Sequence, residues 1–432
     1  MKIISFLGFN SYQEVTYIHP SNPAQTSTTP FFQEALLDFY DVDTLYVLLT
    51  KTVATQAPRN ATRSNWEALQ ERIGNKVKLE PIFDIPESHA PEDNWIIFDK
   101  ITNCLNHGDR VVFDLTHSFR SLPVIALLAI SYLRTVRQVQ VEGLVYGAFD
   151  PNAKDQPAPT YDLLPMLSLL DWIAATDRFV KVGDGAPLAD LLNNAIPGTE
   201  KAQNPTVRPL AKQLEQIAKI IAEISQAIAL ARPLETLTLA EQMEAIFKQA
   251  DTGIDQRAKP FALIADQLLD GYGQFSLADN LDTEKLTQNL WLQFQMIDWY
   301  MKRGQIVQAM TLAGEWLISM TSYYLDNHHL LEDRKQVRFA LNNGLALLQK
   351  KIPHGPSKFD QSFQTLANHQ EISKLWGQLS DLRNNLAHVG MRKDYRSAAS
   401  LKKEAEDKIM PQLQVIAQTL LTTDSDQLEH SV

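Results

Sequence analysis

The sequence predicts two domains, a Rossmann-like α/β domain followed by an all-α domain. Up to residue 149, short runs of apolar residues alternate with single amphipathic helices, which is the pattern of a mostly parallel, doubly wound sheet. From residue 163 onward, apolar residues recur only at three- and four-residue spacing, which is the helical period. The length of 432 residues is also too great for one ordinary domain.

Strands and helices alternate in order along the first domain. We expect Thr29 to cap the first helix, with Pro30 at its first position, and Ser64 to cap the second. Hydroxyl side chains accept hydrogen bonds from the free N–H groups of a helix start, and proline has no N–H to leave unpaired there. The strands are expected at residues 2–8, 44–50, 77–83, 110–115 and 139–149, and the helices at residues 31–39, 64–73, 95–105 and 122–136.

The second domain is expected to contain helices alone. Residues 151–159 form a turn-rich loop, and the apolar helix at 163–173 leads out of the sheet domain. We therefore place the two domains at residues 1–180 and 181–432, with an irregular stretch rich in glycine and proline at 183–198. Helices are expected at residues 210–231, 239–250, 261–269, 283–301, 306–325, 337–350, 371–388 and 398–421.

Composition and charge narrow the class of protein. The net charge of -11 gives no long-range attraction for nucleic acid, so a polyanion must be met by a local basic site. The single cysteine, Cys104, excludes an internal disulfide and a cysteine-rich zinc site. The N-terminal run MKIISFLGFN is predicted as a strand rather than a signal peptide, and the longest apolar passage, residues 124–133, is shorter than the roughly 20 residues of a membrane span. We expect a cytoplasmic protein with no membrane association.

A polar loop, residues 114–120 with the sequence DLTHSFR, joins a buried strand to an apolar helix. Strand ends and helix N-termini meet at such a crossing and offer free N–H groups. The loop is therefore expected to bind an anionic ligand, with Asn10 and Ser11 after the first strand as weaker candidates. Local roles are the alternative: Asp114 could cap the loop, and Arg120 could pair with a nearby acid.

Several common ligand motifs are missing from the sequence. The first strand is followed by GFNS and not by G-x-G-x-x-G, and G-x-x-x-x-G-K-[ST] does not occur. Ser118 does not lie in G-x-S-x-G. Dinucleotide binding, the P-loop mechanism and a hydrolase nucleophile elbow therefore lack support.

A second chemical signal lies in the helical half, where residues 383–388 read RNNLAH. Gly390 is a natural helix terminator, which places His388 in the last turn, where the helix dipole favours the imidazolium form. Arg383 is always charged and suits a phosphate. A five-residue spacing puts the two side chains about 140° apart on one helix. Two copies facing each other across a two-fold axis would bring both groups to one site.

The alternative is a purely structural pair, with a surface arginine bound to an acid and a histidine that caps the helix. The motif occurs once in the chain. Glu315, in an apolar helix, could hold Arg383 in place, or it could be a buried carboxylate with another partner.

Together the two signals resemble the CRISPR-associated ribonucleases that join a CARF sensor domain to a HEPN effector domain. Residues 114–120 look like the signature loop that follows the fourth strand of this family, and residues 383–388 look like its HEPN motif. The resemblance covers nearly the whole chain, with the sensor first and the effector second.

The resemblance implies a function and a set of site residues. A cyclic oligoadenylate, with cyclic tetra-adenylate favoured and cyclic hexa-adenylate as the other ring size, would bind the sensor and activate metal-independent cleavage of single-stranded RNA in a type III CRISPR antiviral defence. No further cofactor and no metal is implied. The products would carry a 2′,3′-cyclic phosphate, and a homodimer or higher oligomer is implied. The implied catalytic residues are Arg383, His388 and Asn384, and the implied ligand-binding residues are Thr116, His117, Ser118 and Arg120, with Asn10 and Ser11.

Two other functions stay open at this point. The protein could be a ligand-responsive regulator without catalytic activity, in which Arg383 and His388 are structural. It could also be a nuclease that degrades its own cyclic ligand in the sensor loop, with help from Thr116 or Ser118.

Overall fold

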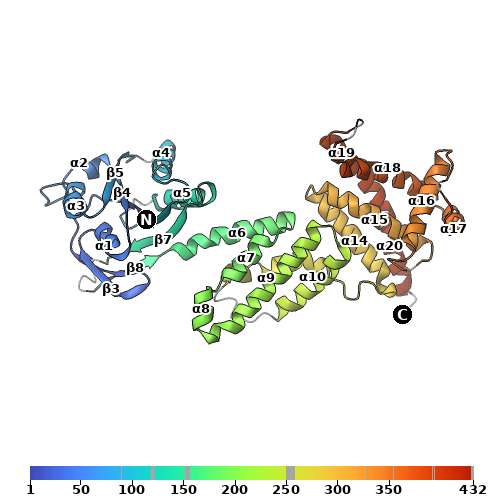
Figure 1. Ribbon diagram of the computed structural model, residues 1–432, viewed down its shortest axis with the longest axis horizontal. Helices are drawn as coiled ribbons and strands as arrows, with labels where there is room; N and C mark the ends of the chain where they lie inside the picture. Colours follow the sequence, from blue (N-terminus) through green and yellow to red (C-terminus); the bar gives the residue numbers. More distant parts are fainter. Residues whose placement is uncertain are drawn as a thin grey trace. The chain divides into compact units, whose positions relative to one another are not determined.

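The structure divides into two compact units, residues 1–171 and residues 172–432 (Figure 1). It is a computed structural model that describes residues 1–88, 90–117, 122–150, 156–249, 258–327, 329–353, 355–391, 393 and 395–429, with only the backbone described for 420–429. The division falls within helix α6 (Leu164–Val182).

An eight-stranded sheet forms the centre of the first unit, in the order β3-β2-β8-β7-β6-β1-β4-β5. The strands from β7 to β5 are parallel to one another, as the alternating pattern predicts. The remaining edge is mixed, because β8 is antiparallel to β7 and β2 is antiparallel to β3. The strands are β1 (Lys2–Phe6), β2 (Val15–His19), β3 (Asn22–Thr29), β4 (Thr44–Thr50), β5 (Lys78–Ile85), β6 (Arg110–Asp114), β7 (Gln140–Gly147) and β8 (Ala158–Asp162).

Helices cover both faces of this sheet. On one face, Ile4 and Phe113 pack against α4 and α5, while on the other Ile3 and Val112 pack against α1 and α3. Alternate side chains of one strand therefore enter two separate cores, which is why its sequence reads as a continuous apolar run. The helices are α1 (Phe32–Phe39), α2 (Lys51–Thr55), α3 (Asn65–Ile73), α4 (Pro91–Thr102) and α5 (Leu122–Val136).

Two local predictions for this unit have different outcomes. Ser64 caps α3 as expected, and Glu67 completes a capping box with it. Thr29 does not cap α1, because it ends strand β3, and the cap position is Phe31 without a side-chain bond. The hydroxyl of Thr29 instead donates to Glu34 at 2.6 Å.

Among the described residues of the second unit, all regular elements are helices, and the Rossmann-like plus all-α prediction is confirmed. One large core runs through it, with Phe179, Tyr272 and Trp316 among the largest buried side chains. Residues 183–198, predicted as irregular, contain a helix, and the long helix predicted at 398–421 has a π-helical turn at Ala405–Ile409. The main helices are α7 (Ala186–Asn194), α9 (Arg208–Ala229), α10 (Pro233–Lys248), α14 (Leu286–Lys302), α15 (Ile306–Tyr324), α16 (Arg334–Leu348), α18 (His369–Ala387), α19 (Ala398–Glu404) and α20 (Met410–Glu429), and the shorter ones are α8 (Gly198–Gln203), α12 (Lys259–Ala262), α13 (Ala265–Tyr272) and α17 (Asp360–Thr365).

Within the described ranges, none of the helices is both long and apolar enough to cross a membrane.

Candidate ligand and catalytic sites

The first candidate site lies where the order of the parallel strands reverses. Strand β1 is paired with β4 on one side and with β6 on the other, so the chain leaves β1 in one direction and returns on its opposite side. The loops after β1 and β6 diverge at this point, and open α/β sheets bind ligands in the crevice between such loops. The polar loop of residues 114–120 begins at the end of β6.

Asp114 holds the start of this loop in place. Its side chain is fully buried, and its carboxylate accepts hydrogen bonds from Ser5 Oγ at 2.6 Å and from the N–H of Thr116 at 2.8 Å. Burial raises the pKa of Asp114 to about 6, although these hydrogen bonds act to lower it. The hydroxyl of Thr116 accepts a hydrogen bond from the N–H of Gly147, at the end of β7. The structural role considered for Asp114 is therefore confirmed.

His117 is the loop residue with an unused hydrogen-bonding atom. Its ring lies 4.5 Å from the ring of Tyr12, measured between centroids, so the loops after β1 and β6 meet here. The Nε2 atom is shielded from solvent and has no hydrogen-bond partner among the described residues. Burial lowers the pKa of His117 to about 4, which keeps the imidazole neutral near pH 7. A shielded, unpaired nitrogen is costly, and a ligand atom could satisfy it.

The loop after β1 is held by a residue that the sequence did not single out. The side-chain amide of Asn65, on α3, donates to the carbonyls of Gly8 and Asn10. Asn10 and Ser11 are exposed in this loop, and the Ser11 hydroxyl donates to the carbonyl of Arg59.

Two of the predicted ligand residues, Ser118 and Arg120, lie outside the described residues.

The burial of His117 leads to a pH-dependent prediction. In the unfolded chain, His117 binds a proton as the pH falls below 6.5. In the folded chain, it binds that proton only near pH 4. The contribution of His117 to stability is therefore complete above pH 6.5 and is lost as the pH falls towards 4. Relative to His117→Asn, wild type should lose about 3 kcal/mol of unfolding free energy between pH 7 and pH 4, measured by urea denaturation at both pH values.

Asp114 has the opposite effect in the same pH range. Because its folded pKa is raised, its protonation stabilises the fold as the pH falls through about 6, so wild type alone should show a shallow pH profile. The difference in unfolding free energy between wild type and His117→Asn isolates the contribution of His117. His107→Asn, which removes an exposed histidine, is the control for the loss of an imidazole. A difference between wild type and His117→Asn that does not change with pH would contradict the prediction.

The second candidate site lies at the C-terminal end of α18. Buried apolar residues at helical spacing, among them Leu375, Leu379 and Leu382, fix one face of this helix against the core. The helix ends where expected: His388 is its cap residue, and Val389 and Gly390 follow in the left-handed region with φ of 46° and 77°. Asn384 and His388 are exposed at this end.

Arg383 is held from the neighbouring helix. Its Nη2 atom lies 3.5 Å from Oε1 of Glu315, on α15, so the sequence-based suggestion that Glu315 faces this helix is confirmed. The alternative suggestion also holds, because the same carboxylate binds Arg334 at 2.9 Å and Arg338 at 3.2 Å. Burial acts to raise the pKa of Glu315, but the hydrogen bond and charge of Arg334, with the charges of Arg338 and Arg383, outweigh it and hold the pKa below its usual value.

Arg383 also packs directly onto the backbone of α15 at Gly314. A Cβ atom at this glycine would lie 2.6 Å from Cζ of Arg383, so a larger residue cannot coexist with the present position of the guanidinium. The sequence does not reveal this role, because a glycine inside a helical pattern can have several causes. Arg334 and Arg338 were missed as well, since they become neighbours of Arg383 only through Glu315.

Comparison with known proteins finds matches to the first unit and to part of the second. The family model of the CARF domain of the CRISPR system endoribonuclease Csx1 matches residues 2–151, and that of the second domain of the CRISPR-associated protein MJ1674 matches residues 168–276. The curated MJ1674 protein of Methanocaldococcus jannaschii is 28% identical over 129 residues, which are 30% of this chain but only 19% of that protein. Enterococcus italicus Csm6, solved bound to cyclic hexa-2′-fluoro-hexa-dAMP, is 11% identical, with a TM-score of 0.41 over 98% of this chain and 93% of that one.

The switch-point site and the family match together define a CARF domain in residues 2–151. A region that matches the second domain of a CRISPR-associated protein follows it, at residues 168–276. The resemblance of the first domain to a CARF domain is thereby confirmed.

Proposed function

We propose that this protein is a cytoplasmic endoribonuclease of type III CRISPR antiviral defence, activated by a cyclic oligoadenylate. The observation that carries the proposal is the end of α18, where Arg383 is held by Glu315 and the exposed Asn384 and His388 lie close by in the sequence. In this proposal the CARF domain with its connecting helix occupies residues 1–180, and a HEPN ribonuclease domain occupies residues 181–432.

The proposed reaction cuts single-stranded RNA without a metal ion. The ribose 2′-oxygen loses its proton and attacks the adjacent phosphorus, the bond to the 5′-oxygen breaks, and that oxygen takes up a proton. The products are a 2′,3′-cyclic phosphate and a free 5′-hydroxyl. Arg383 stabilises the charge that grows on the phosphate oxygens, His388 transfers a proton or positions the phosphate, and Asn384 orients the neighbouring groups.

The site is proposed to be composite, built from two copies of the chain. Arg383 and His388 project in different directions from one helix, so a second copy would supply the missing group. An apolar stripe on α5 offers a surface for such pairing, because Val124, Leu128, Tyr132 and Val136 are each at least 45% exposed at four-residue spacing. We propose a homodimer, on which higher oligomers could be built.

The activator is proposed to bind at the switch point of the sheet. Thr116, His117, Ser118 and Arg120 would contact it, with Asn10 and Ser11 from the facing loop. The shielded Nε2 of His117, which has no hydrogen-bond partner in the described part of the chain, supports a ligand in this place. Cyclic tetra-adenylate is the favoured ring, and cyclic hexa-adenylate is the second candidate.

An RNA cleavage assay tests the function and the catalytic residues together. Wild type, Arg383→Ala and His388→Ala are incubated with single-stranded RNA in EDTA, each with no activator, cyclic tetra-adenylate or cyclic hexa-adenylate. Wild type should cut RNA only with an activator, and each variant should cut about 10²- to 10⁴-fold more slowly.

His107→Ala is the matched control for the removal of an exposed histidine, and it should cut like wild type. If wild type binds a cyclic oligoadenylate but cuts no RNA, the protein is a ligand-responsive regulator and the nuclease proposal fails. If His388→Ala cuts as fast as wild type, the residue assignment fails.

A further inference from the structure

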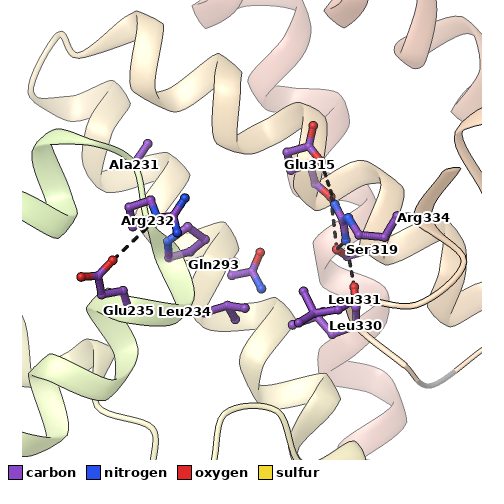
Figure 2. A pocket seen from close by; sticks show the side chains of 11 residues that line it. Ala231, Arg232, Leu234, Glu235, Gln293, Glu315, Ser319, Leu330, Leu331 and Arg334 are labelled. Atoms are coloured by element: carbon purple, nitrogen blue, oxygen red, sulfur yellow. Dashed lines mark hydrogen bonds and ion pairs between the residues drawn. The ribbon is translucent and has the colours of Figure 1, made fainter.

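The helical unit contains a cavity of about 350 Å³ that shares a wall residue with the Arg383 site (Figure 2). The turn between α9 and α10, helices α14 and α15, and the segment that leads into α16 form its described walls. Small-molecule sites in proteins occupy about 300 to 1,000 Å³, so this cavity suits one nucleotide-sized group.

One wall of the cavity is charged. Arg334 is anchored there by hydrogen bonds to Ser319 Oγ at 2.7 Å and to both the carbonyl and the carboxylate of Glu315 at 2.9 Å. The other carboxylate oxygen of Glu315 faces Arg338 and Arg383. Three guanidinium groups thus meet one carboxylate, which leaves an excess of positive charge in a chain of net charge -11. A phosphate would be attracted to Arg338 and Arg383, whose side chains are partly exposed.

The other walls offer an apolar surface and one oriented amide. Leu234, Leu330 and Leu331 line the cavity and could contact the faces of a flat ring. Gln293 lies on the wall formed by α14, and its Nε2 donates to Asn289 Oδ1 at 2.6 Å. Asn289 is itself oriented, because its Nδ2 donates to the carbonyl of Asn280. This chain of bonds leaves the Gln293 Oε1 atom as a hydrogen-bond acceptor for a ligand.

We propose that this cavity binds one base of the RNA substrate, and that the base carries an exocyclic amino group. Gln293 Oε1 accepts a hydrogen bond from that amino group, and Arg338 and Arg383 hold the phosphate next to the base. Uracil has a carbonyl oxygen where cytosine has the amino group, and this oxygen would face the Gln293 Oε1 acceptor, so uracil is disfavoured. The inference rests on the proposed nuclease function for its biological meaning, but the cavity can be tested without cleavage.

The test measures binding of cytidine and uridine 3′-monophosphates by calorimetry. These two nucleotides differ in the amino group of the base, and neither contains the adenine for which the CARF site is proposed. Wild type should bind the cytidine nucleotide about tenfold more tightly than the uridine nucleotide. Gln293→Leu should bind the two equally.

A second variant avoids the buried position of Gln293. Leu331 is 58% exposed at the cavity, so Leu331→Trp should fill the cavity without unfolding the chain and should weaken cytidine nucleotide binding at least tenfold. Leu281 is also 58% exposed but does not line the cavity, so Leu281→Trp is the control and should bind like wild type.

The outcomes separate this inference from the proposed function. If the cytidine nucleotide does not bind wild type, or binds Leu331→Trp as it binds wild type, the cavity is not a base site. If it binds as expected but wild type cuts no RNA with either activator, the nuclease proposal fails and the nucleotide site stands. Where RNA is cut, wild type should cut a uridine-only RNA about tenfold more slowly than a cytidine-containing one, and Gln293→Leu should remove that difference.

Discussion

Replacement of Gly314 by alanine should reduce activated RNA cleavage about 100-fold and leave the fold intact. The new Cβ would lie 2.6 Å from Cζ of Arg383, and the end of a flexible arginine can swing away more easily than two packed helices can separate. The guanidinium would then leave the position that Glu315 defines. A displacement of about 1 Å in a catalytic group can reduce a rate 10²-fold. Cleavage is measured with saturating activator, and folding by thermal unfolding.

Gly271→Ala is the matched control for this substitution. Gly271 lies in helix α13 (Ala265–Tyr272), and a Cβ there would meet no atom within 4 Å. The control should cut RNA like wild type and should be as stable or slightly more stable, since alanine favours a helix over glycine. Full activity of Gly314→Ala would show that the position of Arg383 beside α15 does not matter for cleavage.

Replacement of Trp316 by alanine should destabilise the helical unit by about 3 to 5 kcal/mol. The side chain is fully buried in the core, its ring packs 5.6 Å from that of Phe294 between centroids, and its Nε1 donates to the carbonyl of Leu290 at 2.8 Å. The substitution leaves a large cavity between α14 and α15. Guanidinium denaturation followed by circular dichroism measures the loss.

Trp95→Ala is the control for the loss of a tryptophan, because Trp95 is 70% exposed on α4. Its unfolding free energy should stay within about 0.5 kcal/mol of wild type. Equal losses for the two tryptophan variants would mean that burial of Trp316 is not what stabilises the unit.

Local sequence patterns predicted much of the fold because the elements concerned are locally consistent. Strand β4 and helix α5 have the predicted bounds, and Ser64 forms the predicted cap, since apolar periodicity and capping chemistry need only neighbouring residues. The adjacent strands β3, β2 and β8 were missed. The sequences of β3 and β8, NPAQTSTT and APTYD, contain proline and polar residues, and pairing with the neighbouring strands β2 and β7 makes them part of the sheet.

The same distinction applies to the two candidate sites. By itself, the sequence determined which residues are proposed to carry the chemistry: the polar loop that begins at Asp114 and the Arg383–His388 motif were identified from residue types and spacing. The sequence also suggested Glu315 as a partner of Arg383, but only the tertiary structure decided between the alternatives and supplied the other contacts. Tyr12 against His117, and Glu315 with Arg334 and Gly314 against Arg383, come together from separate elements. Such contacts depend on how helices and strands pack in space, and no periodicity within one segment encodes them.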